Sequence, residues 1–428
     1  MKKIILVLLF LVSNNFLYAQ CKDSYNASDR KVYILKINKK VNDVVKKIPF
    51  MEEYYIYKNA PYISIVIKNT HVRNFLENVY KIENISEIKE DGMKQPFFTI
   101  PDDPLYYDQW YVDFLGLPFL WDSVKNNYDK LTLPEKTVIA IIDTGVDLEH
   151  PELKNVFWVN NMEIPNNGID DDANGYIDDV NGINSDCMGC KQQNVQATEC
   201  SNHGTFMAGV ISAKKNNHLG IAGIGPNNVK LLICKAGTDT GMPNSSVFRA
   251  LDYIIEMKKR GVNIIAVNMS YGGKEKSDLE EHLLEELEAN NIIPIIAAGN
   301  EDKNLDLHPI YPASYKSDAT LVVGSIGPNG EKSSFSNYGF NTVDMFAPGQ
   351  SILTTAYVYG EHGYGITDGT SISTPMVAAA VAYLYELYPS YSMSELKKLL
   401  IQKGLFSFPL IRYGRNGRIL DFKKIYNN

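Results

Sequence analysis

Three short segments that lie far apart in the chain carry an acid, an imidazole and a hydroxyl group. Asp143 lies in Ile-Ile-Asp-Thr-Gly, His203 in Asn-His-Gly-Thr and Ser371 in Asp-Gly-Thr-Ser. A serine hydroxyl is a poor nucleophile at neutral pH, so it needs a histidine to accept its proton and a buried carboxylate to orient that histidine. Taken singly, each residue also fits a turn, a helix cap or a partly buried histidine. Their combination predicts a catalytic triad.

The sequence around each of these residues predicts a regular element that ends or begins there. Residues 137–142 are apolar and partly β-branched, which is typical of a buried strand that delivers Asp143 at its carboxyl end. Small and apolar residues follow His203 and suit a helix packed closely on the core. Ser371 opens a second predicted helix that runs to about Tyr388. We therefore expect rigid positions for all three side chains.

Buried strands and helices alternate through the rest of this region. The predicted strands are residues 137–142, 229–235, 262–269, 292–298 and 320–325. The predicted helices include residues 280–290 and a segment that ends before Gly261, whose shared apolar face is formed by Val247, Leu251, Ile254 and Ile255. This order predicts an α/β fold, with a mostly parallel sheet covered by helices on both faces. Functional sites of such sheets gather at the carboxyl ends of strands, where Asp143 and Asn300 fall.

Five motifs resemble those of the subtilisin-like (subtilase) serine peptidases and keep the order of that family along the chain. The three active-site signatures are Asp-Thr-Gly-Val-Asp, His-Gly-Thr-Phe-Met-Ala-Gly and Gly-Thr-Ser-Ile-Ser-Thr-Pro-Met. Asn-Met-Ser-Tyr-Gly-Gly from Asn268 and Ala-Ala-Gly-Asn ending at Asn300 also match. The resemblance runs from about Pro101 to the carboxyl terminus and implies a subtilisin-like fold. One departure is Phe206, at a position where the family commonly has a second histidine.

The resemblance implies a serine endopeptidase and gives each matched residue a role. Ser371 would attack the peptide carbonyl to form an acyl-enzyme, and His203 would act first as general base and then as general acid. Asp143 would orient His203, and the Asn300 amide together with the Ser371 N–H would hold the oxyanion. For Asn300, the alternative is a residue that merely caps a turn after a strand.

The resemblance also implies where a peptide would bind. The backbone of Ser270, Tyr271 and Gly272 would pair with an extended peptide, and Ala298 and Gly299 would help to wall the pocket for the side chain before the scissile bond. For the segment that begins at Ser270, the alternative is a plain turn after a strand. An esterase could use the same triad, but a peptide-pairing segment favours amide substrates. The preferred side chain stays open.

Composition and the amino terminus predict where the protein works. The chain has 428 residues, 45% of them hydrophobic, and a formal net charge of -8, which argues against general nucleic-acid binding. Lys2 and Lys3, the apolar run 4–12 and the sequence before Ala19 resemble a signal peptide comprising residues 1–19. That run is too short to span a bilayer. We expect a secreted or periplasmic monomer without a membrane span, and a lipid anchor at Cys21 is the weaker alternative.

Residues 20–100 lack the peptidase motifs and predict a separate small domain. Strands are expected at 31–38, 52–57, 62–68 and 85–90, and helices at 40–47 and 70–80. That βαββαβ order is ferredoxin-like. In subtilisin-like peptidases a small α+β propeptide occupies this place, so the resemblance implies a zymogen with an inhibitory propeptide before a catalytic domain at residues 101–428. The junction between the propeptide and the catalytic domain is expected between Asp91 and Asp103. The alternative is that residues 20–100 form a permanent accessory domain.

An acidic segment predicts a metal site. Asp170, Asp172, Asn174 and Asp178 fall at alternate positions around a glycine turn, and the Tyr176 carbonyl could add another oxygen. Calcium prefers such oxygen ligands, and no organic cofactor is expected. A solvated acidic loop is the alternative.

The cysteines allow two interpretations. Cys187 and Cys190, followed by Cys200 and His203 at the same spacing, have the outline of a zinc site. Zinc would occupy the expected catalytic base and leave a non-catalytic scaffold protein. Because the chain is expected to be exported, a disulfide among these three cysteines is favoured. Cys234, in an apolar strand, is expected to be a buried thiol.

Overall fold

The computed structural model describes residues 30–37, 44–57, 61–79, 81–90, 100–125, 137–187, 189–190, 193–198, 201–315, 317–318, 320–358 and 360–426. The chain divides into two compact units, Met1–Phe97 and Phe98–Asn428, here called the first and second units. The predicted signal peptide and its alternative anchor at Cys21 lie outside the described residues.

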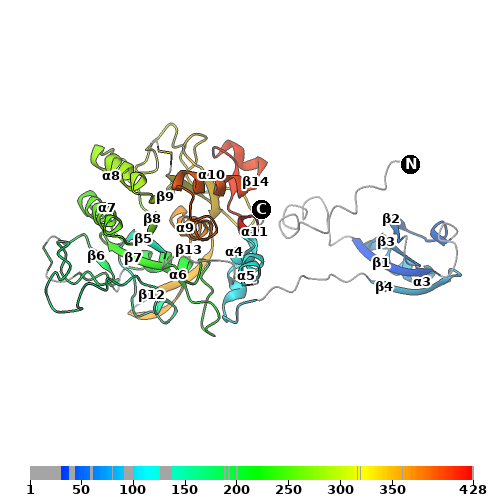
Figure 1. The fold of residues 1–428 in the computed structure, drawn as a ribbon. Helices are drawn as coiled ribbons and strands as arrows, with labels where there is room; N and C mark the ends of the chain where they lie inside the picture. The colour runs from blue at the N-terminus through cyan, green and yellow to red at the C-terminus, as the bar shows by residue number, and fades with distance from the viewer. Residues whose placement is uncertain are drawn as a thin grey trace. The chain divides into compact units, whose positions relative to one another are not determined.

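The first unit is built on a four-stranded antiparallel sheet in the order β2-β3-β1-β4 (Figure 1). Its elements are β1 (Arg30–Ile37), β2 (Met51–Ile56), β3 (Tyr62–Lys68), the 3-10 turn η1 (Asn69–His71), α3 (Val72–Val79) and β4 (Ile85–Glu90). Alternate residues of β3 point to one face, so Ile63, Ile65 and Ile67 are buried together with Phe75 of α3.

The strand order confirms the predicted ferredoxin-like topology of this unit. Strands β2, β3 and β4 and helix α3 lie within one or two residues of the predicted ranges. Of the predicted helix 40–47, Val44 and Val45 are helical and pack into the core, while residues 40–43 are outside the described part.

The second unit contains a nine-stranded sheet in the order β14-β15-β11-β10-β9-β8-β5-β7-β6. The strands are β5 (Val138–Asp143), β6 (Gly182–Asn184), β7 (Lys230–Lys235), β8 (Ile264–Met269), β9 (Ile293–Ala297), β10 (Leu321–Ile326), β11 (Met345–Pro348), β14 (Leu405–Phe406) and β15 (Arg418–Ile419). All neighbours pair in parallel except β14 and β15. The five predicted strands are confirmed as β5, β7, β8, β9 and β10.

Helices cover both faces of this sheet, as predicted (Figure 1). Helices α7 (Asn244–Lys259) and α8 (Asp278–Ala289) lie on one face, and α6 (His203–Ser212) and α9 (Thr370–Leu387) lie on the other. The remaining helices are α4 (Trp110–Phe114), α5 (Leu117–Lys125), α10 (Met393–Lys403) and α11 (Phe422–Tyr426), with short 3-10 turns at Tyr106–Asp108, Pro151–Leu153 and Phe408–Arg412. None of the helices among the described residues combines the length and the apolarity needed to cross a membrane.

Burial on both faces explains the composition of the central elements. All six residues of β5, β8 and β10 are buried, and almost the whole of α9 is buried between the sheet and its neighbouring helices. A separate antiparallel hairpin, β12 (Ile352–Val358) and β13 (Glu361–Thr367), packs against α6. Elements far apart in sequence thus meet around α6 and α9.

Candidate functional site

The Asp143 and His203 side chains meet where β5 ends and α6 begins. His203 Nδ1 lies 2.9 Å from each oxygen of the Asp143 carboxylate. The Asp143 side chain is fully buried, whereas that of His203 is 31% exposed. Asp143 Oδ1 also accepts a hydrogen bond from the Thr144 N–H at 2.8 Å. The bond to Nδ1 fixes the ring and leaves Nε2 as the nitrogen that can take up a proton.

Helix α6 approaches β5 closely because its second residue is a glycine. A Cβ on Gly204 would lie 2.2 Å from the Gly145 carbonyl oxygen and 3.2 Å from Asp143 Cβ. The Gly204 N–H donates to Thr144 Oγ1 at 3.3 Å, which ties the helix start to the strand end. The predicted close packing after His203 is therefore what brings the imidazole to the carboxylate.

Two carboxylates act on the protonation of His203. Burial lowers the pKa of the imidazole, but the charge and hydrogen bond of Asp143 and the charge of Asp239 outweigh it, so the pKa lies above the ordinary value. Asp239 is held near the start of α6 because its oxygens accept hydrogen bonds from Ser201 Oγ and the Asn202 N–H, both at 3.0 Å. Sequence reasoning missed Asp239, which lies outside the motifs.

Ser371 and Asn300 flank Gly369 at the start of α9. A Cβ on Gly369 would lie 2.8 Å from Ser371 Oγ and 3.5 Å from Asn300 Nδ2, and its φ of 152° disfavours other residues. Asn300 Oδ1 accepts hydrogen bonds from the Thr370 N–H at 2.8 Å and the Thr370 hydroxyl at 3.0 Å. The amide is thereby oriented, so Nδ2 remains available as a donor beside the serine.

Ser270 connects the two helices that carry the imidazole and the hydroxyl. Its Oγ donates to the Ser371 carbonyl oxygen at 2.8 Å and lies 3.4 Å from Met207 Sδ on α6. The Asn268 amide donates to the same hydroxyl at 2.9 Å. Packing of α6 on α9 thus places Ser371 on the His203 side of the sheet, although no hydrogen bond between these two side chains occurs among the described contacts.

The segment predicted to pair with a peptide extends beyond the sheet. The strand pairings of β8 end at Met269, so Ser270, Tyr271 and Gly272 follow the strand. Gly273 then exchanges two backbone hydrogen bonds of 2.7 Å with Tyr311. Burial strongly raises the pKa of the Tyr271 hydroxyl, which has no hydrogen-bond partner within the described part of the chain.

The buried side chain of Asn337 helps to hold the segment that follows β9. Its Nδ2 donates to the Ala298 carbonyl oxygen at 2.9 Å, and its Oδ1 accepts from the N–H groups of Glu301 and Lys303 at 3.0 and 2.8 Å. A Cβ on Gly299 would lie 2.4 Å from Asn337 Nδ2, so the glycine allows this approach. Nothing in the sequence around Asn337 indicated this positioning role.

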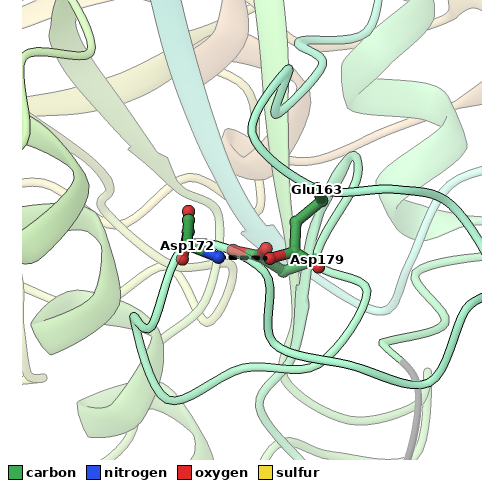
Figure 2. A group of neighbouring side chains, drawn as sticks. All are labelled: Glu163, Asp172 and Asp179. Atoms are coloured by element: carbon green, nitrogen blue, oxygen red, sulfur yellow. Dashed lines mark hydrogen bonds between the residues drawn. The ribbon is translucent and has the colours of Figure 1, made fainter.

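The acidic loop gathers a different set of carboxylates from the predicted one. Glu163, Asp172 and Asp179 offer ligand atoms that all lie within 4.8 Å of one another, and Figure 2 shows them on one loop. Asp172 Oδ1 is buried and has no hydrogen-bond partner in the described structure. Burial raises the pKa of Asp179 to about 6, against hydrogen bonds from Tyr253 and other neighbours that lower it.

Of the five predicted ligands, only Asp172 belongs to this group. The carboxylate of Asp170 accepts the N–H groups of Asn174 and Gly175, and Asp178 accepts those of two residues earlier in the loop. Asn174 directs its Nδ2 toward Asp172 and Asp179, because its Oδ1 accepts the Tyr176 N–H. These bonds close the loop. Glu163, whose oxygens also accept loop N–H groups, and Asp179 are ligand candidates that the spacing did not indicate.

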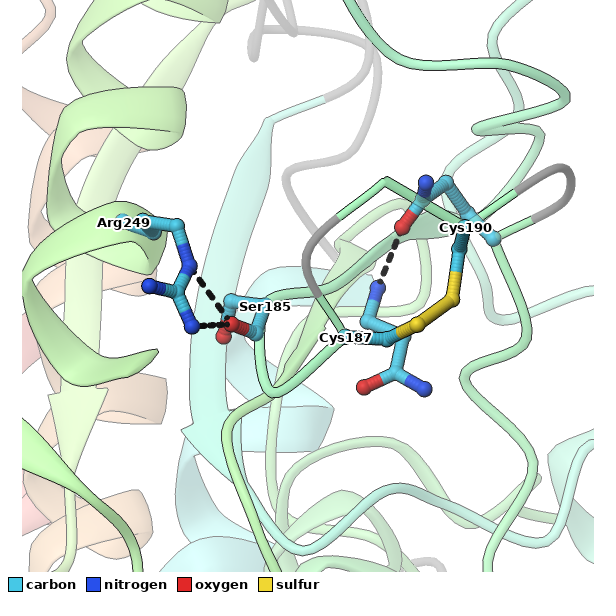
Figure 3. Close-up of a disulfide and its surroundings, with 6 residues drawn as sticks. Ser185, Cys187, Cys190 and Arg249 are labelled. Carbon is cyan, nitrogen blue, oxygen red and sulfur yellow. Dashed lines mark hydrogen bonds between the residues drawn. A yellow bond between two sulfur atoms is a disulfide. The ribbon is translucent and has the colours of Figure 1, made fainter. Parts of the chain in front are cut away.

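The cysteines favour the disulfide interpretation. Cys187 and Cys190 form a disulfide after β6 (Figure 3). In the same view, Arg249 Nε and Nη2 donate to the carbonyl oxygen of Ser185, two residues before Cys187, at 2.8 and 2.5 Å. The disulfide occupies Cys187 and Cys190, so two of the thiolates that the zinc site would need are not available. The third cysteine, Cys200, lies outside the described residues. Cys234 is a buried free thiol, as predicted, and burial raises its pKa.

Comparisons with known proteins agree on one family. A family model described as "Subtilase family" matches residues 135–416. Subtilisin-like protease 1 of Plasmodium berghei (strain Anka) is 29% identical over 341 residues, which cover 75% of this chain and 53% of that protein. The subtilisin of Bacillus pumilus is 28% identical over 279 residues, covering 65% of this chain and 86% of that protein. This chain thus spans only about half of the Plasmodium relative.

The fold also has a solved counterpart. A structure described as proteases from Pseudoalteromonas arctica PAMC 21717 has a TM-score of 0.59 and 23% identity, and the match covers 77% of this chain and 99% of that one. This likeness supports the architecture alone. The family model, in contrast, covers well over half of the chain and includes the Asp143, His203, Asn300 and Ser371 positions. The chain therefore belongs to the subtilase family.

Proposed function

We propose that this chain is a serine endopeptidase that cleaves peptide bonds through Asp143, His203 and Ser371. The observation that carries the proposal is the buried Asp143–His203 pair, with Nδ1 at 2.9 Å from both carboxylate oxygens, on the helix that packs against the one beginning beside Ser371. Family membership and the printed names of the relatives support the same reaction class.

In this proposal, His203 Nε2 takes the Ser371 proton while Oγ bonds to the substrate carbonyl carbon. Asn300 Nδ2 and the Ser371 N–H donate to the resulting oxyanion. The intermediate then collapses, the carbon–nitrogen bond breaks, and His203 returns the proton to the leaving amine. Water, activated by His203, hydrolyses the acyl-enzyme. Asp143 keeps the imidazole oriented and stabilises its protonated form throughout.

We also propose that the acidic loop binds calcium. Three carboxylates lie together there with only partial compensation, since Arg260 Nη1 is 3.9 Å from Asp172 Oδ1. Burying like charges together is costly unless a cation is present. An all-oxygen donor set suits calcium, and Glu163, Asp172 and Asp179 would hold it. Bound calcium would neutralise these charges and so stabilise the loop.

The first unit is proposed to be a propeptide and the protein a zymogen, exported by residues 1–19. A separate ferredoxin-like fold supports the propeptide, and a disulfide is typical of an oxidising compartment. Asp103 accepts the N–H groups of Asn216 and Asn217, and Asp102 accepts that of His218. These bonds tie Asp102 and Asp103 into the second unit and favour a junction before Asp102, with a permanent accessory domain as the alternative.

The test compares the full-length chain with Ser371→Ala on an unfolded protein substrate, in calcium, with products identified by mass spectrometry. We expect the wild type to cleave the substrate and to cut itself between residues 91 and 101, and the variant to do neither. Substrate cleavage without self-cleavage would support the accessory-domain alternative. No Ser371-dependent cleavage, with or without the first unit, would overturn the peptidase proposal.

A further inference from the structure

A basic cavity lies beside the two segments proposed to bind substrate. Its volume is about 310 Å³, and its lining residues are Lys274, Lys303, His308, Pro309 and Ile310. Two of the five carry a permanent positive charge, and a third gains one on protonation. A cavity of this kind contrasts with the chain as a whole, whose formal net charge is -8.

One wall of this cavity belongs to the segment proposed to pair with a peptide. Lys274 follows Gly272 by two residues, and a Cβ on Gly272 would lie 3.0 Å from Ile310 Cγ2. The paired hydrogen bonds of 2.7 Å between Gly273 and Tyr311 hold these two stretches side by side. A peptide that extends along Ser270–Gly272 would therefore run past the edge of the cavity.

Another lining residue, Lys303, belongs to the segment that carries the proposed oxyanion donor. The Lys303 N–H donates to Asn337 Oδ1 at 2.8 Å, and Asn337 Nδ2 donates to the Ala298 carbonyl oxygen at 2.9 Å. One buried amide thus fixes the backbone of Lys303 relative to Ala298, with Asn300 between them. The cavity lies beside the segment where the substrate carbonyl would be polarised.

The charges of the two lysines are not cancelled by the acidic residues next to them in sequence. Neither Glu301 nor Asp302 lines the cavity: Glu301 Oε2 accepts a hydrogen bond from Asn337 Nδ2 at 2.7 Å, and Asp302 pairs with Lys332 at 2.7 Å. Glu275 is exposed and does not line the cavity. Within the described part of the chain, neither Lys274 nor Lys303 has an ion-pair partner.

We infer that this cavity selects an acidic side chain immediately before the scissile bond. The inference rests on the proposed peptidase function and gives that site its substrate class. Lys274 and Lys303 supply the charge, and Ile310 and Pro309 contact the methylene groups of the bound side chain. Glutamate reaches farther into such a cavity than aspartate, so it is the preferred residue.

The test uses matched peptides that differ only in the residue before one cleavable bond. Glutamate and glutamine have the same shape, so the ratio of their kcat/KM values isolates charge. We expect the full-length protein, after any self-cleavage is complete, to prefer glutamate by roughly fivefold to tenfold, as two partly exposed ion pairs allow. Lys274→Gln/Lys303→Gln should bring the ratio close to one. Lys259→Gln/Lys398→Gln, an equal charge change at exposed positions of α7 and α10, is the matched control and should keep the wild-type ratio.

Salt gives an independent readout of the same preference. The glutamate-to-glutamine ratio should fall as sodium chloride rises from about 0.05 to 0.5 M, because screening weakens exposed ion pairs. Cleavage sites in an unfolded protein, identified by mass spectrometry, should be enriched in glutamate before the cut. Both effects should disappear in the double variant.

The outcomes separate this inference from the function on which it rests. If Ser371-dependent cleavage occurs but glutamine is cleaved as well as glutamate, the inference is overturned and the peptidase proposal stands. The same holds if the double variant keeps the glutamate preference. If neither peptide nor an unfolded protein is cleaved in a Ser371-dependent way, the proposed function fails and the inference fails with it.

Discussion

The second unit contains two groups of candidate functional side chains that are held in opposite ways. Asp143, His203 and Ser371 lie at the ends of β5, α6 and α9, which are largely buried. The group of Glu163, Asp172 and Asp179 lies on a loop that precedes β6, where side chains cap backbone N–H groups. The first group gains its geometry from the core. The second depends on compensation of its charges, so the two should respond differently to substitution.

The largest effect should come from removing the nucleophile. Ser371→Ala is expected to lower kcat by roughly 10⁶-fold, the size of effect known for the corresponding change in subtilisin. The melting temperature should stay close to that of wild type, because the core holds α9 in place. Steady-state kinetics and a thermal melt check the two halves of this prediction. A large fall in melting temperature would show that the serine also has a structural role.

The next largest effect should come from the oxyanion donor. Asn300→Ala is expected to lower kcat by about 10²–10³-fold with little change in KM, as known for this kind of donor in subtilisin. The amide lies beside Ser371 and is oriented by Thr370, so it would act on the transition state. Equal rises in KM for several peptides, with kcat unchanged, would instead assign Asn300 to substrate binding.

Calcium binding to the acidic loop should raise the thermal stability of the protein. Calcium at about 100 times its dissociation constant should stabilise the wild type by about 2.7 kcal/mol, seen as a rise in melting temperature. Asp172→Asn should remove most of that rise, because it removes the carboxylate whose buried Oδ1 has no hydrogen-bond partner among the described residues. Asp171→Asn makes the same charge change on the neighbouring residue, outside the group, and is the control. Equal calcium responses in both variants would contradict the proposed ligands.

The smallest effect should be a shift in pH dependence. His203 must be neutral to act as a base, so kcat/KM should fall as the imidazole becomes protonated. Because the pKa of His203 is raised, this fall should occur at a higher pH than for an ordinary imidazole. The Asp239 charge contributes to that rise, so Asp239→Asn should lower the pKa and move the acid limb to lower pH. Profiles of kcat/KM at low ionic strength would measure it. If the acid limb of the profile did not move, the rise in the pKa of His203 would be due to Asp143 and not to Asp239.

The bounds of the regular elements could be predicted because the periodicity of apolar residues follows from which face of each element is buried. The strand that ends at Asp143 and the helix that begins near Ser371 were expected within one or two residues of their observed bounds. The first unit was equally predictable, since strict alternation in β3 decides which face is buried. Strands as short as β14 and β15, two residues each, carry too little pattern to be predicted.

Loop residues escaped prediction because tertiary contacts decide what they do. Asp170 and Asp178 were predicted as ligands from their spacing; each accepts backbone N–H groups of its own loop and lies outside the group of three carboxylates. Glu163 joins the group of three carboxylates from outside the acidic run. Asn337 holds the segment after β9 from nearly forty residues away in sequence. Such long-range side-chain contacts leave no local pattern in a single sequence.

The strand order has a consequence for synthesis of the chain. Strand β5 pairs with β8, more than one hundred residues later, and α9 then packs against β8, β9, β10 and β11. A ribosome therefore completes Asp143 and His203 long before the serine emerges. An unfinished chain that stops before α9 would lack Ser371, so under the proposed mechanism incomplete translation products would be unable to cleave neighbouring proteins. The long wait for native partners also makes such chains prone to misfolding, since parallel sheets with distant contacts fold slowly.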